Sequence, residues 1–504
     1  MNYDTVVVGA GPAGLSAGTG IGSAGGQVMI VDRNSGPGGQ LIKQIHKFFG
    51  SAGVCAGIRG IRLAEKFYQT ALQNNCSFLF NAEVYAIEDD EQGGYRVYAG
   101  NGKKTSLLTA RTVVLAAGAS EKALAFPGWT LPGVITAGAA QTMVNVYHVA
   151  CGRRVLIVGA GNVGLIVAYQ LLQAGINVEA VIEASPHIGG YEVHADKIRR
   201  AGIPVLTSHS IVEARGTDTV EEALITRVDK DFVPVPGTER TLKVDTICLA
   251  VGLLPLTGLA ETAGCEIVSP EGRTEFFIRH DEQMRTSRPG IFVAGDAAGV
   301  DEASIAIEEG AIAGLYAAGY LGLLDAQSVS QKAQIRQAVI QDIRTPGVRH
   351  TPVFDYSAYE NQDTLKAVIE CFQEIPCNPC EKNCPVGAIK VGKQLSALPR
   401  IAVDACIGCG KCVAVCPGQA CFMFNPGYSK DTSEICIPYE YLPLPPEGCE
   451  VQALDRNGNA VCKAIVLKVV SRAAYDKTRL LHILVPRSFA FEVRSVVPAG
   501  GNDL

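Results

Sequence analysis

The run DTVVVGAGPAG, residues 4–14, carries a short apolar strand directly into three spaced glycines. In dinucleotide-binding units, one such glycine makes a tight turn, one lets a pyrophosphate approach the backbone and one lets helix and strand pack closely. An acid about 20 residues further on binds ribose hydroxyls, and Asp32 ends the next apolar run. The stretch predicts a nucleotide site at a helix N-terminus, with a buried turn that binds no ligand as the alternative. The predicted site residues are Gly9, Gly11, Pro12, Ala13, Gly14, Asp32 and Arg33.

The same order of features returns after Arg154, where VLIV leads into a second set of glycines and Glu183 ends the following strand. A carboxylate at the ribose position repels a 2′-phosphate, which favours NAD(H) over NADP(H). Arg199 and Arg200 lie further on and leave that preference open. The alternative is a retained scaffold, or a unit that binds an adenine nucleotide without hydride transfer. The predicted site residues are Gly159, Gly161, Asn162, Val163, Gly164 and Glu183.

Further apolar runs connect these two units. We expect buried strands that end in glycine turns at 111–119, 244–252 and 290–299, and a closely packed helix within 302–324. The fold class is therefore α/β, with two Rossmann-like three-layer dinucleotide-binding domains. The first domain is expected to comprise 1–120 and 251–325, the second 121–250, and 326–370 is expected to be a connecting segment.

Cysteines are concentrated near the C-terminal end: of 17 in the chain, five precede residue 300 and twelve lie between Cys371 and Cys462. The run from Cys406 to Pro417 follows the bacterial ferredoxin pattern CxxCxxCxxxCP residue for residue. Its fourth cysteine is expected to ligate a neighbouring cluster. Zinc is the alternative, although it favours two CxxC pairs at a longer separation. The predicted iron-sulfur ligands are Cys377, Cys380, Cys384, Cys406, Cys409, Cys412 and Cys416.

The upstream half of this cysteine block is a degenerate copy, with Glu374 where the first cysteine belongs. Crosswise ligation predicts one complete 4Fe-4S cluster held by Cys384, Cys406, Cys409 and Cys412. A second cluster would use Cys377, Cys380 and Cys416, with Cys371, Cys421 or Glu374 as the fourth ligand. A three-iron cluster, or the loss of this cluster, also remains open.

We expect a ferredoxin-like α+β domain over 371–425, a stiff proline-rich linker over 438–446, and a small β module over 435–504 that contains an Asn457-Gly458 hairpin turn.

With 504 residues and 47% hydrophobic content, the chain has enough material for several packed domains. Its net charge of −6 gives no basic field for nucleic acid. The uncharged stretch 123–152 is too interrupted by proline and glycine for a membrane span. The opening residues show no export signal, so a cytoplasmic location is expected.

Residues 1 to about 325 resemble the flavoproteins with two dinucleotide-binding domains, a pyridine nucleotide-disulfide oxidoreductase-like group. That group contains thioredoxin reductase and the FAD subunits of amine and amino-acid dehydrogenases. The resemblance implies that the first domain binds FAD, that Asp296 contacts the ribityl chain and that the following helix points at the isoalloxazine. Unlike thioredoxin reductases, residues 152–247 contain no cysteine, which disfavours thiol-disulfide exchange. The further residues that carry the resemblance are Gly39, Gln40, Ala117, Gly118, Gly295 and Asp296.

A flavin accepts two electrons as a hydride and a cubane carries one electron at a time, so the combination predicts a two-to-one electron converter. The favoured hypothesis is the electron-transferring subunit of a multisubunit dehydrogenase. The chain resembles the FAD subunits of cyanide-forming glycine, opine and proline dehydrogenases. In those enzymes a partner flavoprotein oxidises the small-molecule amine or amino acid. A self-sufficient NAD(P)H oxidoreductase that reduces ferredoxin or another acceptor is the second hypothesis, and an electron-transfer scaffold is the third. No catalytic residue set is recognisable in the sequence.

Overall fold

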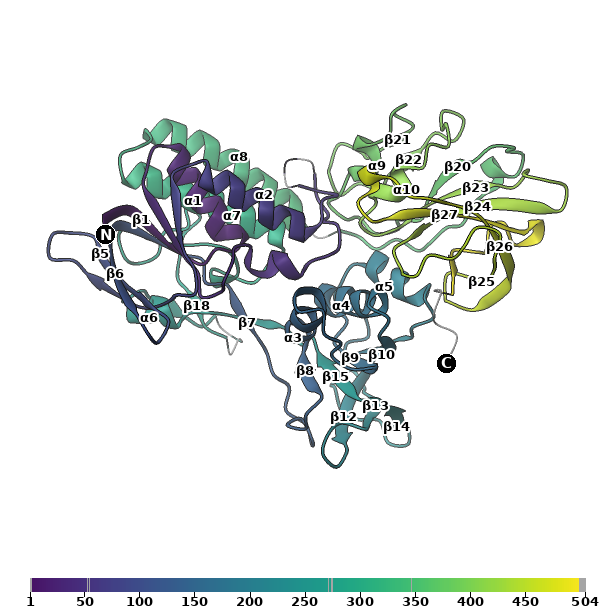
Figure 1. Cartoon of the computed structure of the whole chain (residues 1–504), viewed down its shortest axis with the longest axis horizontal. Helices are drawn as coiled ribbons and strands as arrows, with labels where there is room; N and C mark the ends of the chain where they lie inside the picture. Colours follow the sequence, from purple (N-terminus) through teal and green to yellow (C-terminus); the bar gives the residue numbers. More distant parts are fainter. Residues whose placement is uncertain are drawn as a thin grey trace. The chain divides into compact units, whose positions relative to one another are not determined.

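The computed structural model describes residues 2–51, 53, 55–270, 272, 275–345 and 347–497. The chain divides into two compact units, each assembled from separate stretches of sequence (Figure 1). Unit 1 comprises 1–45, 58–122 and 252–345, and unit 2 comprises 46–57, 123–251 and 346–504. Each unit is described separately below.

Unit 1 contains a seven-stranded sheet in the order β3-β2-β1-β6-β5-β4, with β19 also paired to β6. Strands β1, β2, β3, β6 and β19 pair in parallel, whereas β4, β5 and β6 pair antiparallel. Strands β2 and β19 are entirely apolar and buried, as expected for parallel strands covered on both faces. The strands are β1 Asn2–Val8, β2 Val28–Val31, β3 Cys76–Leu79, β4 Glu83–Asp89, β5 Tyr95–Gly100, β6 Thr105–Leu115 and β19 Ile291–Val293; smaller strands are β7 Ala119–Glu121, β16 Leu253–Pro255, β17 Ile267–Val268 and β18 Phe277–Ile278.

The helices of unit 1 are α1 Pro12–Ser23, α2 Gly60–Leu72, α6 Gly258–Thr262, α7 Ala303–Tyr320 and α8 Ala326–Arg344. Glycines let α1 and α7 approach closely, because a Cβ atom at Gly310 of α7 would lie 2.1 Å from the carbonyl oxygen of Ala13 in α1. Helix α8 packs on α7 and belongs to this unit (Figure 1). Part of the expected connecting segment 326–370 is therefore a long helix of unit 1 rather than a linker.

Unit 2 begins with a five-stranded parallel sheet in the order β11-β10-β9-β15-β8. Beside it, β12, β13 and β14 form a three-stranded antiparallel sheet. The two Rossmann-like domains expected from the sequence are thus both present. The elements are β8 Val134–Thr136, β9 Arg154–Val158, β10 Asn177–Glu183, β11 Val205–Thr207, β12 His209–Arg215, β13 Glu222–Arg227, β14 Arg240–Lys243 and β15 Thr246–Leu249, with helices α3 Ala137–Gln141, α4 Asn162–Gln173 and α5 Glu192–Arg199.

The C-terminal part of unit 2 is a seven-stranded antiparallel sheet in the order β20-β23-β24-β27-β26-β25-β28. It takes β20 from the expected connecting segment and β23 from the expected ferredoxin-like domain, so it crosses both predicted boundaries. The strands are β20 Lys366–Ile369, β23 Cys421–Asn425, β24 Thr432–Tyr439, β25 Glu450–Leu454, β26 Ala460–Val470, β27 Arg479–Pro486 and β28 Ser495–Val496; between β20 and β23 lie α9 Pro379–Lys382, β21 Ile389–Lys390, β22 Arg400–Ile401 and α10 Lys411–Val415.

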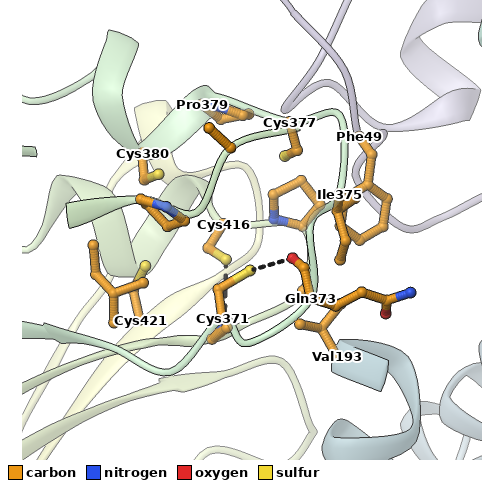
Figure 2. Close-up of a pocket in the computed structure, with 16 residues that line it drawn as sticks. Phe49, Val193, Cys371, Gln373, Ile375, Cys377, Pro379, Cys380, Cys416 and Cys421 are labelled. Carbon is orange, nitrogen blue, oxygen red and sulfur yellow. Dashed lines mark hydrogen bonds between the residues drawn. The ribbon is translucent and has the colours of Figure 1, made fainter. Parts of the chain in front are cut away.

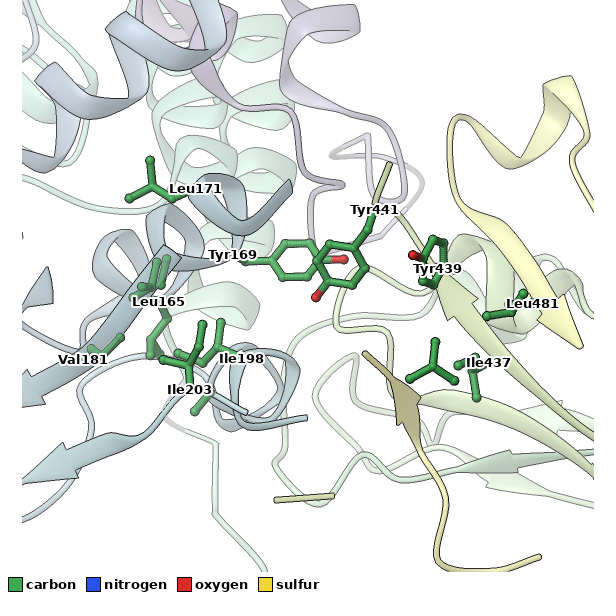
Figure 3. Close-up of a cluster of buried hydrophobic side chains, with 14 of the residues drawn as sticks. Leu165, Tyr169, Leu171, Val181, Ile198, Ile203, Ile437, Tyr439, Tyr441 and Leu481 are labelled. Atoms are coloured by element: carbon green, nitrogen blue, oxygen red, sulfur yellow. The ribbon is translucent and has the colours of Figure 1, made fainter. Parts of the chain in front are cut away.

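The expected linker over 438–446 is wrong at its beginning. Pro438 and Tyr439 end β24, where they pair with Leu480 and Arg479 of β27. Tyr439 and Tyr441 are buried, and Tyr441 packs against Tyr169 of α4 with ring centroids 5.7 Å apart. Figure 3 shows these rings in the cluster that joins the parallel sheet and the C-terminal sheet of unit 2.

Within the described residues, no helix combines the length and the apolar character needed to cross a bilayer.

Candidate functional site

The first glycine loop lies between β1 and α1, and each glycine has a distinct steric environment. Gly9 has φ +107°, and a Cβ atom there would lie 2.2 Å from the carbonyl oxygen of Ala116. A Cβ atom at Gly14 would lie 1.9 Å from the carbonyl oxygen of Gly9. By contrast, no heavy atom of the described residues lies within 4 Å of a Cβ built at Gly11. The chain therefore requires glycine at 9 and 14 for its own packing, and leaves space beside Gly11 for a ligand.

The acid that follows this loop holds the loop in place. The Asp32 carboxylate accepts hydrogen bonds from the backbone N–H of Ala10 at 2.7 Å and of Asn34 at 2.8 Å. The next loop also packs here, because the N–H of Gly38 donates to the carbonyl oxygen of Ala10 at 2.7 Å. Arg33, Gln40 and Ala117 are exposed, and their contact with a ligand stays a prediction. The ribose contact of Asp32 stays a prediction.

The Gly295-Asp296 turn follows β19 as the short helical turn η4, Gly295–Ala297. A Cβ atom at Gly295 would lie 2.8 Å from the Cβ atom of Ala13, so this turn lies against the first turn of α1. Burial raises the pKa of Asp296 to about 6. The structure thus brings Gly295 and Asp296 to the first glycine loop, as the sequence indicated.

Helix α7 adds an acid that the sequence analysis missed. The Glu309 carboxylate accepts from the N–H of Gly295 at 3.1 Å and forms an ion pair with Arg344 of α8 at 2.7 Å. Burial raises the pKa of Glu309 to about 7, although Arg344 opposes the shift. Two neighbouring glutamates in an otherwise apolar helix were the available signal, since Glu308 is also buried and pairs with Arg336 of α8.

The second glycine loop, between β9 and α4, repeats the geometry of the first. Cβ atoms at Gly159 and Gly164 would lie 2.4 Å and 2.0 Å from backbone carbonyl oxygens, whereas one at Gly161 meets no described heavy atom within 4 Å. The Glu183 carboxylate accepts from the N–H of Ala160 and of Ser185, each at 2.9 Å. This loop therefore also has the shape of a nucleotide site. Val163 is exposed at the first turn of α4, and Asn162 accepts from the N–H of Tyr191 at 2.8 Å.

The arginines that left the nucleotide preference open have other partners. Arg199 forms ion pairs with Glu192 and Asp196, and Arg200 donates to the carbonyl oxygen of Gln419 at 3.1 Å. In the same helix, Lys197 contacts the carbonyl oxygen of Pro417 at 3.4 Å. Helix α5 is thus tied to the segment that follows Cys416, within unit 2.

The cysteine block encloses two cavities in unit 2. One is lined by Cys384, Cys406, Cys409 and Cys412, together with apolar side chains that include Ile389. This is the complete crosswise ligand set expected from the spacing. Backbone N–H groups point at two of these sulfurs, from Ala388 to Cys384 at 3.2 Å and from Ala367 to Cys406 at 3.4 Å. Such donors favour thiolate over thiol.

The other cavity is lined by Cys377, Cys380 and Cys416, with Cys371 and Cys421 also in its wall (Figure 2). Ala420 donates its N–H to the Cys416 sulfur at 3.3 Å, and interaction with the Cys421 thiol lowers the pKa of Cys416 to about 6. Phe49 and Val193 close the wall, and neither was signalled by the cysteine spacing.

The chemistry of these walls fits iron-sulfur clusters. Each cavity combines several sulfur donors with apolar lining, which is the environment of a cluster held by cysteine thiolates. Among the described residues, no group of three or more His, Cys, Asp or Glu side chains is placed to hold a single metal ion; the thiols are spread around the two cavities instead.

Comparison with known proteins places both regions in families. Residues 3–310 match the family described as pyridine nucleotide-disulphide oxidoreductase, and residues 375–420 match the 4Fe-4S dicluster domain. An opine oxidase subunit of Agrobacterium tumefaciens (strain Ach5) is 31% identical over 67% of this chain and 69% of its own length. The HcnB subunit of hydrogen cyanide synthase from Pseudomonas aeruginosa is 28% identical over 62% of this chain and 70% of its own length.

Among solved structures, the thioredoxin reductase of T. acidophilum superimposes with a TM-score of 0.53 at 25% identity, over 63% of this chain and 98% of its own. The L-proline dehydrogenase of P. horikoshii gives a TM-score of 0.52 at 22% identity, over 66% of this chain and 59% of its own. These likenesses agree with the paired glycine loops and confirm the fold class expected from the sequence.

Proposed function

Because the chain belongs to the pyridine nucleotide-disulphide oxidoreductase family, and is an FAD-dependent oxidoreductase with a 4Fe-4S domain, we propose that it is the electron-transferring subunit of a multisubunit dehydrogenase. Its proposed substrate class, oxidised with a partner flavoprotein, is a small amine or amino acid. The observation that carries this proposal is the pair of thiol-lined cavities in a chain that also has a complete flavin-type glycine loop.

FAD is assigned to the first glycine loop. The first turn of α1 has no acidic side chain, and its free N–H groups attract the pyrophosphate. Gly11 leaves room for the phosphates, and Asp296 is the proposed partner of the ribityl chain. The bound flavin supplies two-electron hydride chemistry and can release its electrons singly.

Two 4Fe-4S clusters are proposed, one in each thiol-lined cavity. The linings consist mostly of cysteine, isoleucine, proline and alanine side chains, which give the clusters a largely apolar environment. Backbone N–H groups aimed at Cys384, Cys406 and Cys416 would stabilise the negative charge of the ligated sulfurs.

The partner assignment is supported by the names of the relatives, which are subunits of opine oxidase, of hydrogen cyanide synthase and of sarcosine oxidase. We therefore infer a hetero-oligomer with a flavoprotein subunit that oxidises the substrate, and a ferredoxin-like carrier as a candidate electron acceptor. A cytoplasmic location is inferred from the clustered thiols, which persist as metal ligands in reducing compartments. No residue of this chain is proposed to act on the amine itself.

Anaerobic purification from the native cell tests this proposal directly. We expect a second flavoprotein to accompany the chain, and the pair to reduce the flavin of this chain when an amine or amino acid is added. The chain alone should not respond to the amine. A chain that purifies as a homo-oligomer, without any associated protein and with amine oxidation of its own, would contradict the subunit role.

A second function is favoured by one observation, the repeated geometry of the glycine loop at Gly159, Gly161 and Gly164. It would make the chain an NAD(P)H oxidoreductase that reduces ferredoxin or another acceptor, with NAD(H) as the expected nucleotide. An anaerobic titration with NADH separates the two functions: prompt bleaching of the flavin absorbance in the isolated chain supports the second function, and inertness toward NADH supports the first.

A further inference from the structure

We infer that Cys371, which lies outside the ferredoxin pattern, is the fourth ligand of the second cluster, together with Cys377, Cys380 and Cys416. The inference rests on the proposed presence of two clusters and names a ligand that the spacing of the pattern does not supply. The ordinary position for this ligand is 374, which is glutamate here. The region that matches the 4Fe-4S dicluster domain begins at residue 375, after Cys371.

The backbone between β20 and α9 decides which side chains face the second cavity. This segment continues from β20, and Gln373 forms an isolated antiparallel bridge with Arg349, so its side chains alternate between two sides up to the bend at Pro376. Alternate residues line the cavity, in the series Ile369, Cys371, Gln373, Ile375 and Cys377. Cys371 is therefore on the same side of the chain as the pattern's own ligand candidate Cys377.

The residues between them face away from the cavity. Glu370 forms an ion pair with Arg494 at 2.6 Å, and Phe372 packs against Phe354 with ring centroids 5.3 Å apart. Glu374 accepts from His350 at 3.0 Å and from the N–H of Val348 at 3.3 Å. For Glu374 to ligate the cluster, the extended segment would have to turn over, which would expose its apolar side. The alternation thus excludes Glu374.

Cys421 also reaches this cavity, but its position does not suit a ligand. In β23 it pairs with Ile369, and its thiol interacts directly with the thiols of both Cys412 and Cys416. Cys412 belongs to the other cavity. The four sulfurs that hold a cubane bind four different irons and so stay apart from one another. A sulfur in contact with a ligand of each cluster lies between the two clusters rather than at a free corner of one.

Unlike Cys421, Cys371 satisfies the requirement that a ligand sulfur stays apart from the other ligand sulfurs. Its sulfur has a weak contact, 3.8 Å, with the carbonyl oxygen of Gln373 in its own segment. In the view of Figure 2, Cys371 lies below Cys416, whereas Cys377 and Cys380 lie above it. The ligands would thus come from three separate segments around the cavity. Binding replaces the thiol proton with an iron–sulfur bond, and the proton is released to solvent.

The test compares alanine variants of Cys371, Cys421 and Cys406 with the matched control Glu374→Gln, in the full chain purified without oxygen. Iron and acid-labile sulfide are counted, and electron paramagnetic resonance spectra are recorded before and after dithionite. Wild type and Glu374→Gln should hold about eight irons per chain. Cys371→Ala should lose one iron, with the oxidised-state signal of a three-iron cluster, or lose the second cluster entirely. Cys421→Ala should keep both clusters, with changed spectral lines.

Flavin content and far-ultraviolet circular dichroism show whether each variant is folded. If Cys371→Ala fails to fold, Cys371→Ser replaces it: a hydroxyl ligand should retain four irons at this site with a shifted spectrum. Cys406→Ala should damage the other cluster and leave the signal of the second. The ligand assignment is overturned if Cys371→Ala retains two unaltered clusters, or if Cys421→Ala is the variant that loses iron. A wild-type chain with a single cluster would overturn both this assignment and the proposed pair of clusters.

Discussion

Substitution of Gly310 by alanine tests how closely α7 must approach the first glycine loop, which is the proposed FAD site. A Cβ atom at Gly310 would lie 2.1 Å from the carbonyl oxygen of Ala13, which is a backbone atom in the first turn of α1. To reach even 3.0 Å, the two helices must move apart by roughly 1 Å. Overpacking of this kind costs about 1–3 kcal/mol, and a backbone contact places it at the upper end.

Alanine also favours the helix by about 1 kcal/mol relative to glycine, so the net loss is about 2 kcal/mol. For a unit of this size, such a loss lowers the melting temperature by roughly 4–8 °C. Ala13 belongs to the glycine loop itself, so the displacement should also weaken flavin binding. The assay heats the holoprotein and follows flavin fluorescence, which rises on release, beside the circular dichroism of the helices.

Gly20→Ala is the matched control, because it lies in α1 of the same helix pair and a Cβ there would be 3.8 Å from the Cα atom of Gly314. It should keep its flavin and gain up to about 1 kcal/mol from helix propensity. The reasoning is refuted if Gly310→Ala melts at the wild-type temperature with its full flavin content, or if the two variants lose stability equally.

Three other changes probe separate features. Glu370→Gln should destabilise unit 2 by about 3–5 kcal/mol in urea unfolding, because it removes the negative charge that is paired with the buried Arg494 guanidinium. Burial opposes the ionisation of Glu370, but Arg494 and Arg456 outweigh this effect and lower the pKa of Glu370 to about 2. The contribution of Glu370 to the free energy of unfolding should therefore be complete above pH 4.5 and disappear as the pH falls through 2. A variant with wild-type stability at pH 7 would contradict this. Gly161→Ala should leave folding unchanged, since the added methyl group meets no described atom within 4 Å. If the second glycine loop holds a nucleotide, the same variant should abolish NADH binding measured by calorimetry. Asp296 and Glu309 have raised pKa values, about 6 and about 7, so the flavin-free protein should lose stability as the pH rises from about 4 to about 7, with a smaller slope in Glu309→Gln.

The two glycine loops could be predicted from the sequence because their determinants are local. A tight turn, a close approach and an acid lie within one strand-helix-strand unit, and both copies give the same pattern of contacts at Gly9 and Gly159. The crosswise division of the cysteines followed in the same way from a ligand pattern with fixed spacing. The fourth ligand did not, because it depends on which side of an extended segment faces the cavity, and no spacing rule describes that segment.

The errors concern pairings between distant parts of the chain. Strand β20 is short, and its partner β23 follows the whole cysteine block, so nothing near Lys366 indicates a strand. Prolines predicted a linker at 438, yet Pro438 is tolerated at the end of β24, where the strand pairs with β27. Helix α8 is polar along most of its length. It is attached to α7 by a small apolar cluster that includes Val329 and Ala333, and by ion pairs to Glu308 and Glu309 that sequence periodicity does not reveal.

The position of the cysteine block between β20 and β23 has a consequence for gene exchange. The segment that carries the iron ligands is an insertion between two paired strands, and the sheet shares one hydrophobic core with the parallel sheet of unit 2. A transferred segment limited to residues 371–425 would not include β20 or the buried core residues Tyr439 and Tyr441. Exchange of redox modules between relatives should therefore succeed only when the breakpoints are moved out to the edges of the whole sheet.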